Sequence, residues 1–219
     1  MERTPDGAVL VSVNVGQVRH VAYHERDITT GIYKEPVAGR VATHGVNIDG
    51  DDQADRQVHG GPDRAAYAYA EADLTWWSEQ IGRPVPPGSM GENLTTAGLD
   101  VTGALVGERW RVGTVLFEVS SPRVPCFKLG LRMENGRFQQ RFAAAGRPGA
   151  YLRIVEHGAL AAGDPITVVH RPDHDVTVAM IAEAYHADRS LVPLLLVAPE
   201  LTWAWREWAI AHSDGVTRS

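Results

Sequence analysis

Hydrophobic and polar residues alternate over much of the first half of the chain, which is typical of short β-strands separated by turns. Valine occupies every second position from residue 9 to residue 15, so these side chains fall on one face of an extended strand. Two more alternating runs, residues 110–112 and 115–119, flank Gly113-Thr114 and predict a β-hairpin. Further extended segments are expected at residues 32–41, 46–48, 151–155 and 166–169.

Apolar residues at helical spacing predict a helix over residues 70–81. Leu74, Trp77 and Ile81 fall on one face of this helix, and Gly82 ends it. Further helices are expected at residues 137–145, 177–187 and 201–212, and residues 191–197 form a compact apolar segment. The predicted fold class is therefore mainly β with helices, an α+β fold.

The pattern changes after Arg171-Pro172-Asp173-His174, where helical spacing replaces alternation. We therefore predict a strand-rich domain at residues 1–171 and a three-helix domain at residues 172–219. About 45 residues of short helices bury little surface alone. The helices are expected to pack on the larger domain or on another chain.

The chain has 219 residues, of which 21 are basic and 27 acidic, for a net charge of -6. This balance disfavours binding to nucleic acid and to anionic membranes, so neither is an expected partner. No apolar run approaches the roughly 20 residues of a membrane helix, and the first residues lack the pattern of a secretory leader. The single cysteine, Cys126, excludes an internal disulfide. These features predict a cytoplasmic protein.

Two glycine-containing loops carry residues suited to ligand binding. His59 and Arg64 flank Gly60-Gly61, whose unhindered amides suit an anion, although a plain Gly-Gly-Pro turn explains the same pattern. In the second loop Glu92 stands beside Asn93. Their side chains can read the donor and acceptor edge of a heterocycle, and a turn before a strand is the alternative. Neither loop contains a known nucleotide-binding or hydrolase motif.

The loop at residues 119–128 holds Cys126 between Arg123 and Lys128. Cations beside a thiol favour the thiolate, which is the form that acts as a nucleophile or as a metal ligand. Two prolines restrict the loop. An inert buried cysteine is the alternative, but such a residue needs neither the prolines nor the cations. This loop is therefore the strongest candidate for a functional site.

Five segments in order along the chain resemble the MOSC family, which is named after the carboxyl-terminal domain of molybdenum cofactor sulfurases. They are Tyr33-Lys34-Glu35-Pro36-Val37, Gly50-Asp51-Asp52-Gln53-Ala54-Asp55, Val58-His59-Gly60-Gly61-Pro62-Asp63-Arg64-Ala65, Gly91-Glu92-Asn93-Leu94 and Ser121-Pro122-Arg123-Val124-Pro125-Cys126-Phe127-Lys128-Leu129. The resemblance covers residues 9–171 and is greatest to the bacterial YiiM-like branch. Residues 176–212 resemble the three-helix domain appended in that branch.

The resemblance implies a MOSC-type β-barrel domain that binds the molybdenum cofactor, in which molybdopterin holds the metal. It implies that Cys126 ligates molybdenum, and the preference of thiolates for soft metals agrees with this role. His59 is our candidate for a catalytic proton source. Lys34, Arg64 and Arg123 suit the cofactor phosphate, and Glu92 with Asn93 suits the pterin edge. The full set of expected cofactor-binding residues is Lys34, Gly60, Gly61, Asp63, Arg64, Glu92, Asn93, Arg123 and Lys128.

Relatives in this family reduce N-hydroxylated compounds, so the resemblance implies an oxidoreductase for substrates such as 6-N-hydroxylaminopurine. One cysteine cannot hold an iron–sulfur cluster, so a separate flavoprotein-type electron donor is expected. Two other functions fit the same residues. The chain could be a carrier of the cofactor or of sulfur without turnover of its own, or a thiol hydrolase with Cys126 as nucleophile and His59 as base.

Three tryptophans lie close together in the last predicted helix. Trp205 and Trp208 share a face with Leu201, whereas Trp203 lies on nearly the opposite side. One side of the helix is expected to pack inward. Trp203 is expected to meet the strand-rich domain, a second copy in a homodimer, or the electron donor.

Overall fold

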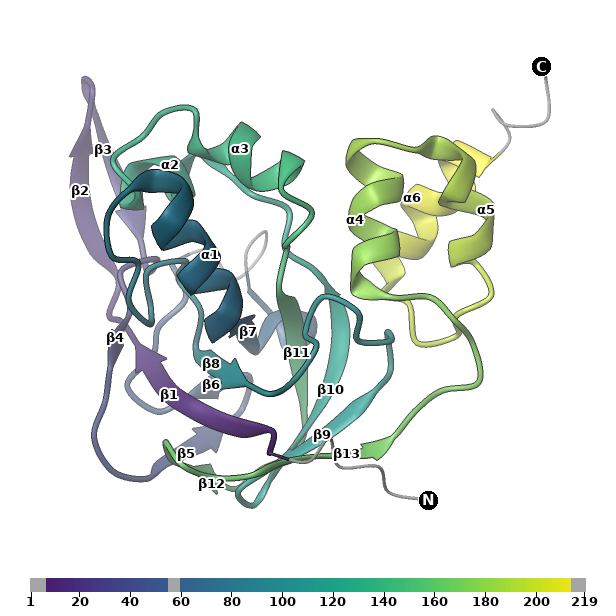
Figure 1. Cartoon of the computed structure of the whole chain (residues 1–219), viewed down its shortest axis with the longest axis horizontal. Helices are drawn as coiled ribbons and strands as arrows, with labels where there is room; N and C mark the ends of the chain where they lie inside the picture. The colour runs from purple at the N-terminus through teal and green to yellow at the C-terminus, as the bar shows by residue number, and fades with distance from the viewer. Residues whose placement is uncertain (1–6, 55–59, 214–219) are drawn as a thin grey trace.

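The computed structural model describes residues 7–54 and 60–213, and within these ranges its main element is an eight-stranded sheet (Figure 1). The strand order is β13-β9-β10-β11-β7-β8-β1-β4. All neighbours are antiparallel except β7 and β8, which are parallel. The strands are β1 (Val9–Val15), β4 (Glu35–Pro36), β7 (Ala66–Ala70), β8 (Leu94–Ala97), β9 (Arg109–Val112), β10 (Val115–Pro122), β11 (Ala150–Glu156) and β13 (Ile166–His170).

The sheet curls until β1 meets the chain that leads into β13. Leu10 accepts a hydrogen bond from the Gly163 amide at 2.8 Å and donates its own amide to the Asp164 carbonyl at 2.9 Å. A single bridge joins Val9 to Pro165. The predicted α+β fold on a barrel-like sheet is therefore confirmed, although no continuous ladder closes the barrel.

Two smaller sheets border the large one. One has the order β12-β5-β6, from β5 (Val41–His44), β6 (Asn47–Ile48) and β12 (Ala159–Leu160). The other is the hairpin of β2 (Arg19–Tyr23) and β3 (Arg26–Thr30), at the left of Figure 1. The sequence analysis missed this hairpin because most of its side chains are exposed or half-buried and show no apolar alternation. The predicted extension over residues 32–41 contains only β4 and the first residue of β5 as strand.

Three helices and a 3-10 turn complete the strand-rich part: η1 (Pro62–Arg64), α1 (Glu71–Ile81), α2 (Phe127–Arg132) and α3 (Phe138–Ala144). The helix predicted over residues 70–81 is α1, and Gly82 ends it in the left-handed conformation, with φ 68°. Trp77 of α1 packs 4.7 Å from Phe138 of α3, between ring centroids, and donates its indole N–H to the Tyr69 hydroxyl at 2.8 Å. This buried aromatic cluster fixes the helices against the sheet.

The C-terminal helices are α4 (Val178–His186), α5 (Val192–Leu195) and α6 (Trp203–Ser213), with the turn η2 (Arg189–Leu191) between α4 and α5. Thr177 caps α4, because its Oγ1 atom accepts from the Met180 amide at 3.0 Å. The helices form a group beside the sheet (Figure 1) with an apolar core of their own, to which Val106 from the strand-rich part contributes. Trp203 is 77% exposed, whereas Trp205 is buried.

No helix in residues 7–54 and 60–213 combines the length and the apolar character needed to cross a bilayer. The hydrophobic core of the strand-rich part lies inside the curled sheet. A second core beneath α1 and α3 supports two segments, one around Met90 and one around Leu129. These two segments lie next to the pocket described below.

Candidate functional site

Six segments that are distant in sequence enclose a pocket with about 730 Å³ of empty space, a volume that includes open solvent. The lining comes from the end of β3 and the following segment, the turn after β6, the start of β7, the loop before β8, the segment from β10 into α2, and the start of β11. The central lining residues are Lys34, Asp51, Asp52, Gln53, Arg64, Tyr67, Asn93, Arg123, Cys126, Lys128 and Tyr151.

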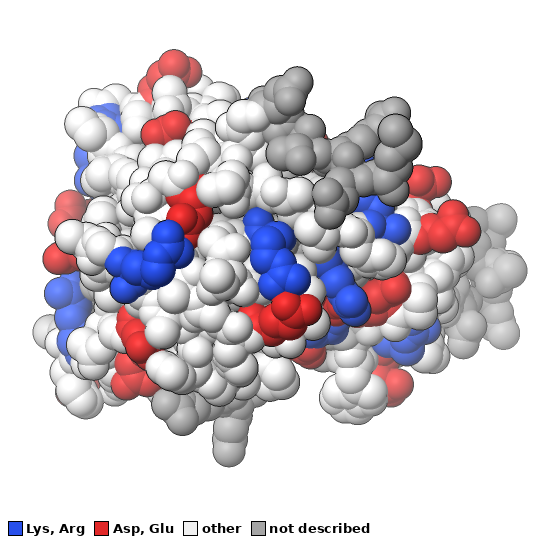
Figure 2. All heavy atoms as spheres, turned by 90° about the horizontal axis from the view of Figure 1, so that it is seen from below, with Lys and Arg blue, Asp and Glu red and all other residues white. Residues whose placement is uncertain are grey.

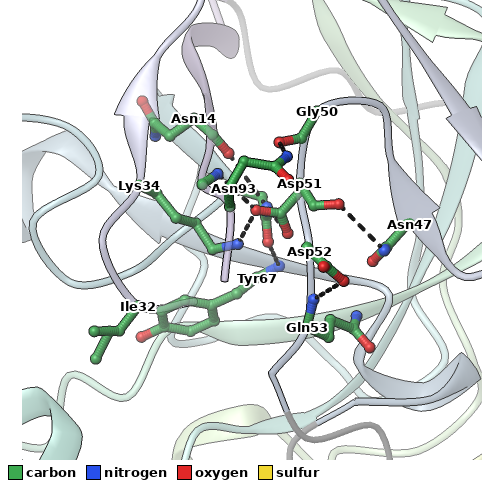
Figure 3. A network of polar contacts seen from close by, with 12 residues as sticks. Asn14, Ile32, Lys34, Asn47, Gly50, Asp51, Asp52, Gln53, Tyr67 and Asn93 are labelled. Atoms are coloured by element: carbon green, nitrogen blue, oxygen red, sulfur yellow. Dashed lines mark hydrogen bonds and ion pairs between the residues drawn. The ribbon is translucent and has the colours of Figure 1, made fainter. Parts of the chain in front are cut away.

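A buried ion pair lies at the bottom of the site (Figure 3). The ammonium group of Lys34 points at the Asp51 carboxylate and donates a hydrogen bond to its Oδ1 atom. Burial lowers the pKa of Lys34 below its ordinary value of 10.5, while the Asp51 charge opposes that shift and the nearby Arg123 adds to it. Removing either partner would therefore leave the other charge buried without a counter-charge.

Asn93 connects this ion pair to the sheet. Its side-chain amide nitrogen donates to Asp51 Oδ2 at 3.0 Å and to the Asn14 carbonyl at 3.2 Å. Its side-chain oxygen accepts from the Tyr67 amide at 3.1 Å. Both donors of Asn93 are thus already used inside the protein. Asn93 lines the pocket and its amide orients Asp51, while its contact with a pterin edge stays a prediction.

Glu92 also faces the interior instead of the pocket. The side chain is fully buried, and its Oε1 atom accepts from the Gly88 amide at 2.6 Å and from Thr95 Oγ1 at 3.0 Å. Its Oε2 atom accepts from the Met90 amide at 3.0 Å. Glu92 therefore holds the loop before β8 in place, and the predicted contact with a cofactor is not supported by this geometry. Burial raises its pKa above 4.5, and these hydrogen bonds oppose the shift.

Arg123 is a buried cation in the wall of the pocket. Its guanidinium donates to the Met90 carbonyl, and its Cζ atom lies 5.0 Å from the centroid of the Tyr67 ring. Arg64 approaches from the opposite chain segment, with Cζ 5.5 Å from the Tyr151 ring. Each arginine is therefore oriented by an aromatic face. Sequence reasoning named the arginines but missed Tyr67 and Tyr151, because alternation in a strand gives no sign that a ring also lines a pocket.

The lining carries an excess of positive charge. Its cationic residues are Lys34, Arg64, Arg123 and Lys128, and its carboxylates are Asp51 and Asp52. On the molecular face drawn in Figure 2, by contrast, basic and acidic side chains are interspersed. The pocket is therefore suited to an anionic group, and the described residues place Lys34, Arg64 and Arg123 around the same space, although they are distant in sequence.

Cys126 lines the pocket from the segment between β10 and α2. It precedes the first residue of α2 and is half-buried. Arg123 interacts electrostatically with it. The helix α2 was not predicted, because it is only six residues long. The loop thus places a soft sulfur ligand beside the cationic lining.

The other expected residues lie away from the lining. Gly60 and Gly61 do not border the pocket, and the Gly61 amide donates to the Gln53 side chain at 3.3 Å. Asp63 forms an ion pair with Arg153. The part that these residues play in cofactor binding stays a prediction. His59 lies outside the described residues.

The sequence profile of the MOSC domain matches residues 55–167, which is just over half of the chain. This chain belongs to the MOSC family. The matched range includes Cys126, Arg123 and Asn93, whereas Lys34 and Asp51 precede it. The MOSC pocket of this chain is therefore completed by residues from the first strands.

Similar proteins cover most of this MOSC chain. Protein YiiM of Escherichia coli (strain K12) is 34% identical over 89% of this chain and 88% of its own length. A reductase of Gibberella moniliformis is 32% identical over 90% of this chain, which corresponds to 36% of that protein. The crystal structure of YiiM from Geobacillus stearothermophilus has a TM-score of 0.76 and 29% identity, covering 94% of this chain and 99% of that one.

Proposed function

We propose that this MOSC protein is an oxidoreductase that binds the molybdenum cofactor in the pocket and reduces N-hydroxylated compounds. The observation that carries the proposal is the position of Cys126, the single cysteine of the chain, beside a pocket lined by four cations. Family membership supports the cofactor, and the similar fungal protein named a reductase supports the reaction class.

The donor groups present fit such a cofactor. Cys126 would ligate molybdenum, because a thiolate is a soft ligand. Arg64, Arg123 and Lys128 would hold anionic groups through charge-assisted hydrogen bonds. Lys34 contributes less free charge, since it already pairs with Asp51. When bound, the cofactor supplies two-electron redox chemistry.

The proposed net reaction converts R–NHOH, two electrons and two protons into R–NH₂ and water. The N–O bond breaks, the nitrogen is reduced, and the oxygen leaves as water. A separate flavoprotein-type donor is our proposal for the source of electrons, since one cysteine cannot hold an iron–sulfur cluster. The fungal relative is longer, as this chain spans about a third of it.

Replacing Cys126 tests the proposal. The wild-type protein, produced together with the enzymes of cofactor synthesis, should contain molybdenum and reduce 6-N-hydroxylaminopurine with a chemical reductant. Cys126→Ser should fold normally and lose this activity, because a hydroxyl is a harder and weaker ligand for the metal. Metal analysis and amine formation are the measurements.

Val155→Ser is a suitable control, because it adds a serine at a position that is 42% exposed and outside the pocket lining. This variant should retain both metal and activity. Full activity in Cys126→Ser would overturn the ligand assignment. Stoichiometric molybdenum without any reduction would favour a carrier, and thiol-dependent hydrolysis in metal-free protein would favour a hydrolase.

A further inference from the structure

A second cleft lies between the C-terminal helices and the strand-rich part. One wall comes from η1, the end of β10, the Cys126 loop and β11, and the other comes from α4 and α6. The lining residues are Arg64, Pro122, Val124, Pro125, Cys126, Tyr151, Tyr185, Ala204, Trp205 and Trp208. Arg64, Val124, Cys126 and Tyr151 also line the first pocket, so the two spaces meet at the cysteine. We call this space the aromatic cleft.

Three aromatic rings form the outer wall of the aromatic cleft. The centroid of Trp208 lies 5.4 Å from that of Tyr185 and 5.4 Å from that of Trp205. Trp205 is buried, whereas Tyr185 and Trp208 are half-buried, so part of both rings remains accessible. The Arg189 guanidinium lies 4.8 Å from the Trp208 ring and helps to hold it.

Both walls are fixed in position. On the inner side, Pro122 and Pro125 restrict the backbone around Cys126. On the outer side, the C-terminal part is hydrogen-bonded to the strand-rich part, because the Val178 amide of α4 donates to the Ala104 carbonyl at 2.9 Å and Arg153 of β11 donates to the Glu200 carbonyl at 3.1 Å. A fixed cleft with aromatic and apolar walls is preorganised for a flat ring, which stacks on aromatic faces.

We infer that the aromatic cleft binds the planar aromatic ring of the substrate, with Trp208 and Tyr185 as the residues that select it. This inference rests on the proposed function and adds two residues that determine which substrates bind. The occupant is a small molecule, because the cleft leads to Cys126 and the reacting group must reach that end. Aromatic N-hydroxylated compounds fit this description, whereas small aliphatic hydroxylamines would gain nothing from the rings.

Trp208→Leu and Tyr185→Leu test the inference, with Trp203→Leu as the matched control on the same helix as Trp208. Trp203 is 77% exposed and does not line the cleft. Calorimetric titration with 6-N-hydroxylaminopurine should show binding weakened about ten- to hundredfold in Trp208→Leu, from the loss of stacking. Trp203→Leu should bind like the wild type. Trp203→Leu should also turn over N-methylhydroxylamine at the wild-type rate.

Trp208→Phe distinguishes a loss of stacking from misfolding. It keeps an aromatic face at this position and should therefore bind the purine with most of the wild-type affinity. Unchanged purine affinity in folded Trp208→Leu and Tyr185→Leu would overturn the inference, even if the protein reduces both compounds. Equal weakening in Trp203→Leu would also overturn it. If the wild type reduces neither compound, the proposed function fails. The calorimetric binding data still test whether the aromatic cleft binds the purine ring.

Discussion

Lys34 shows how the pocket keeps a cation away from water. Its ammonium group is held by Asp51, and Asp51 is in turn held by the Gly16 amide at 2.9 Å and by the Asn93 side chain at 3.0 Å. Each of these contacts restricts one direction in which the carboxylate could turn. The charge of Asp51 therefore faces Lys34, and burial would otherwise favour a neutral amine.

Asp51→Asn should destabilise the protein by about 3–5 kcal/mol at neutral pH, because it leaves a buried ammonium without its partner. The pKa of Lys34 should fall further in the variant, so the loss should shrink as the pH rises from the folded pKa of the variant to that of the wild type, both of which lie below 10.5. Urea unfolding at several pH values measures both effects.

Glu156→Gln is the control for Asp51→Asn, because the Arg111–Glu156 pair is exposed to solvent. Breaking a surface pair costs about 1 kcal/mol or less. A similar small loss in both variants would show that Lys34 and Asp51 are not coupled in a buried environment.

The conformation of the loop before β8 depends on two glycines. Gly88 has φ +83°, and a Cβ atom there would lie 2.4 Å from the Lys34 carbonyl oxygen. Gly91 has φ +74° and is similarly close to the Ile32 side chain. The loop can therefore pack against the lysine segment only with glycine at these positions. Glu92 closes the arrangement by accepting from two amides of the same loop.

Glu92→Gln should destabilise the protein by about 1–3 kcal/mol at neutral pH, because an amide NH₂ group then meets backbone N–H groups that have lost their acceptor. The raised pKa of Glu92 means that the folded chain binds more protons than the unfolded chain above pH 4.5. The contribution of Glu92 to the free energy of unfolding is therefore full below pH 4.5 and declines as the pH rises through the pKa that Glu92 has in the folded chain.

Denaturant unfolding of the wild type and of Glu92→Gln, carried out between about pH 4 and about pH 8, measures the difference in stability between them. The stability of the wild type relative to Glu92→Gln should change across that range. Exposed Glu35 offers a control, since Glu35→Gln leaves no buried donor unpaired. A pH-independent difference between wild type and Glu92→Gln would contradict the assignment.

The elements with strong periodicity could be predicted from the sequence, and these include β1, α1 and the β9–β10 hairpin. The hairpin of β2 and β3 could not, because its side chains are largely in contact with water and no apolar face records the pairing. In the site, the sequence identified Cys126 and the cations by chemical type. It did not show which way Glu92 and Asn93 point, because hydrogen bonds to distant backbone atoms decide that orientation.

At the scale of the whole molecule, Arg153 links three regions. Its guanidinium pairs with Asp63 of η1 and with Glu118 of β10, and it donates to the Glu200 carbonyl before α6. Glu118 is also paired with Arg109. Arg153 is therefore a direct polar link between the sheet and the C-terminal helices, and its loss leaves Glu118 with one cation.

Arg153→Met should loosen the C-terminal helices while the sheet keeps its stability. Hydrogen exchange should accelerate in α4 to α6 more than in β9 and β10, with a total loss of about 1–3 kcal/mol. Arg109→Met is the matched control, because it removes the other partner of Glu118 without reaching the helices. Unchanged exchange in the helices of Arg153→Met would show that their apolar contacts suffice.

The meeting of β1 with residues 163–166 has a consequence for how the chain is made. β1 is synthesised long before the backbone groups that pair with Ala8 and Leu10, which follow only after almost the whole strand-rich part. Contacts between residues so far apart in sequence form slowly, because the long loop between them must close first. Until then the first half of β1 lacks a neighbour on the edge that β4 leaves uncovered, and an unpaired edge invites pairing with other chains. A nascent chain interrupted before residue 163 therefore retains an open strand edge that the finished protein covers.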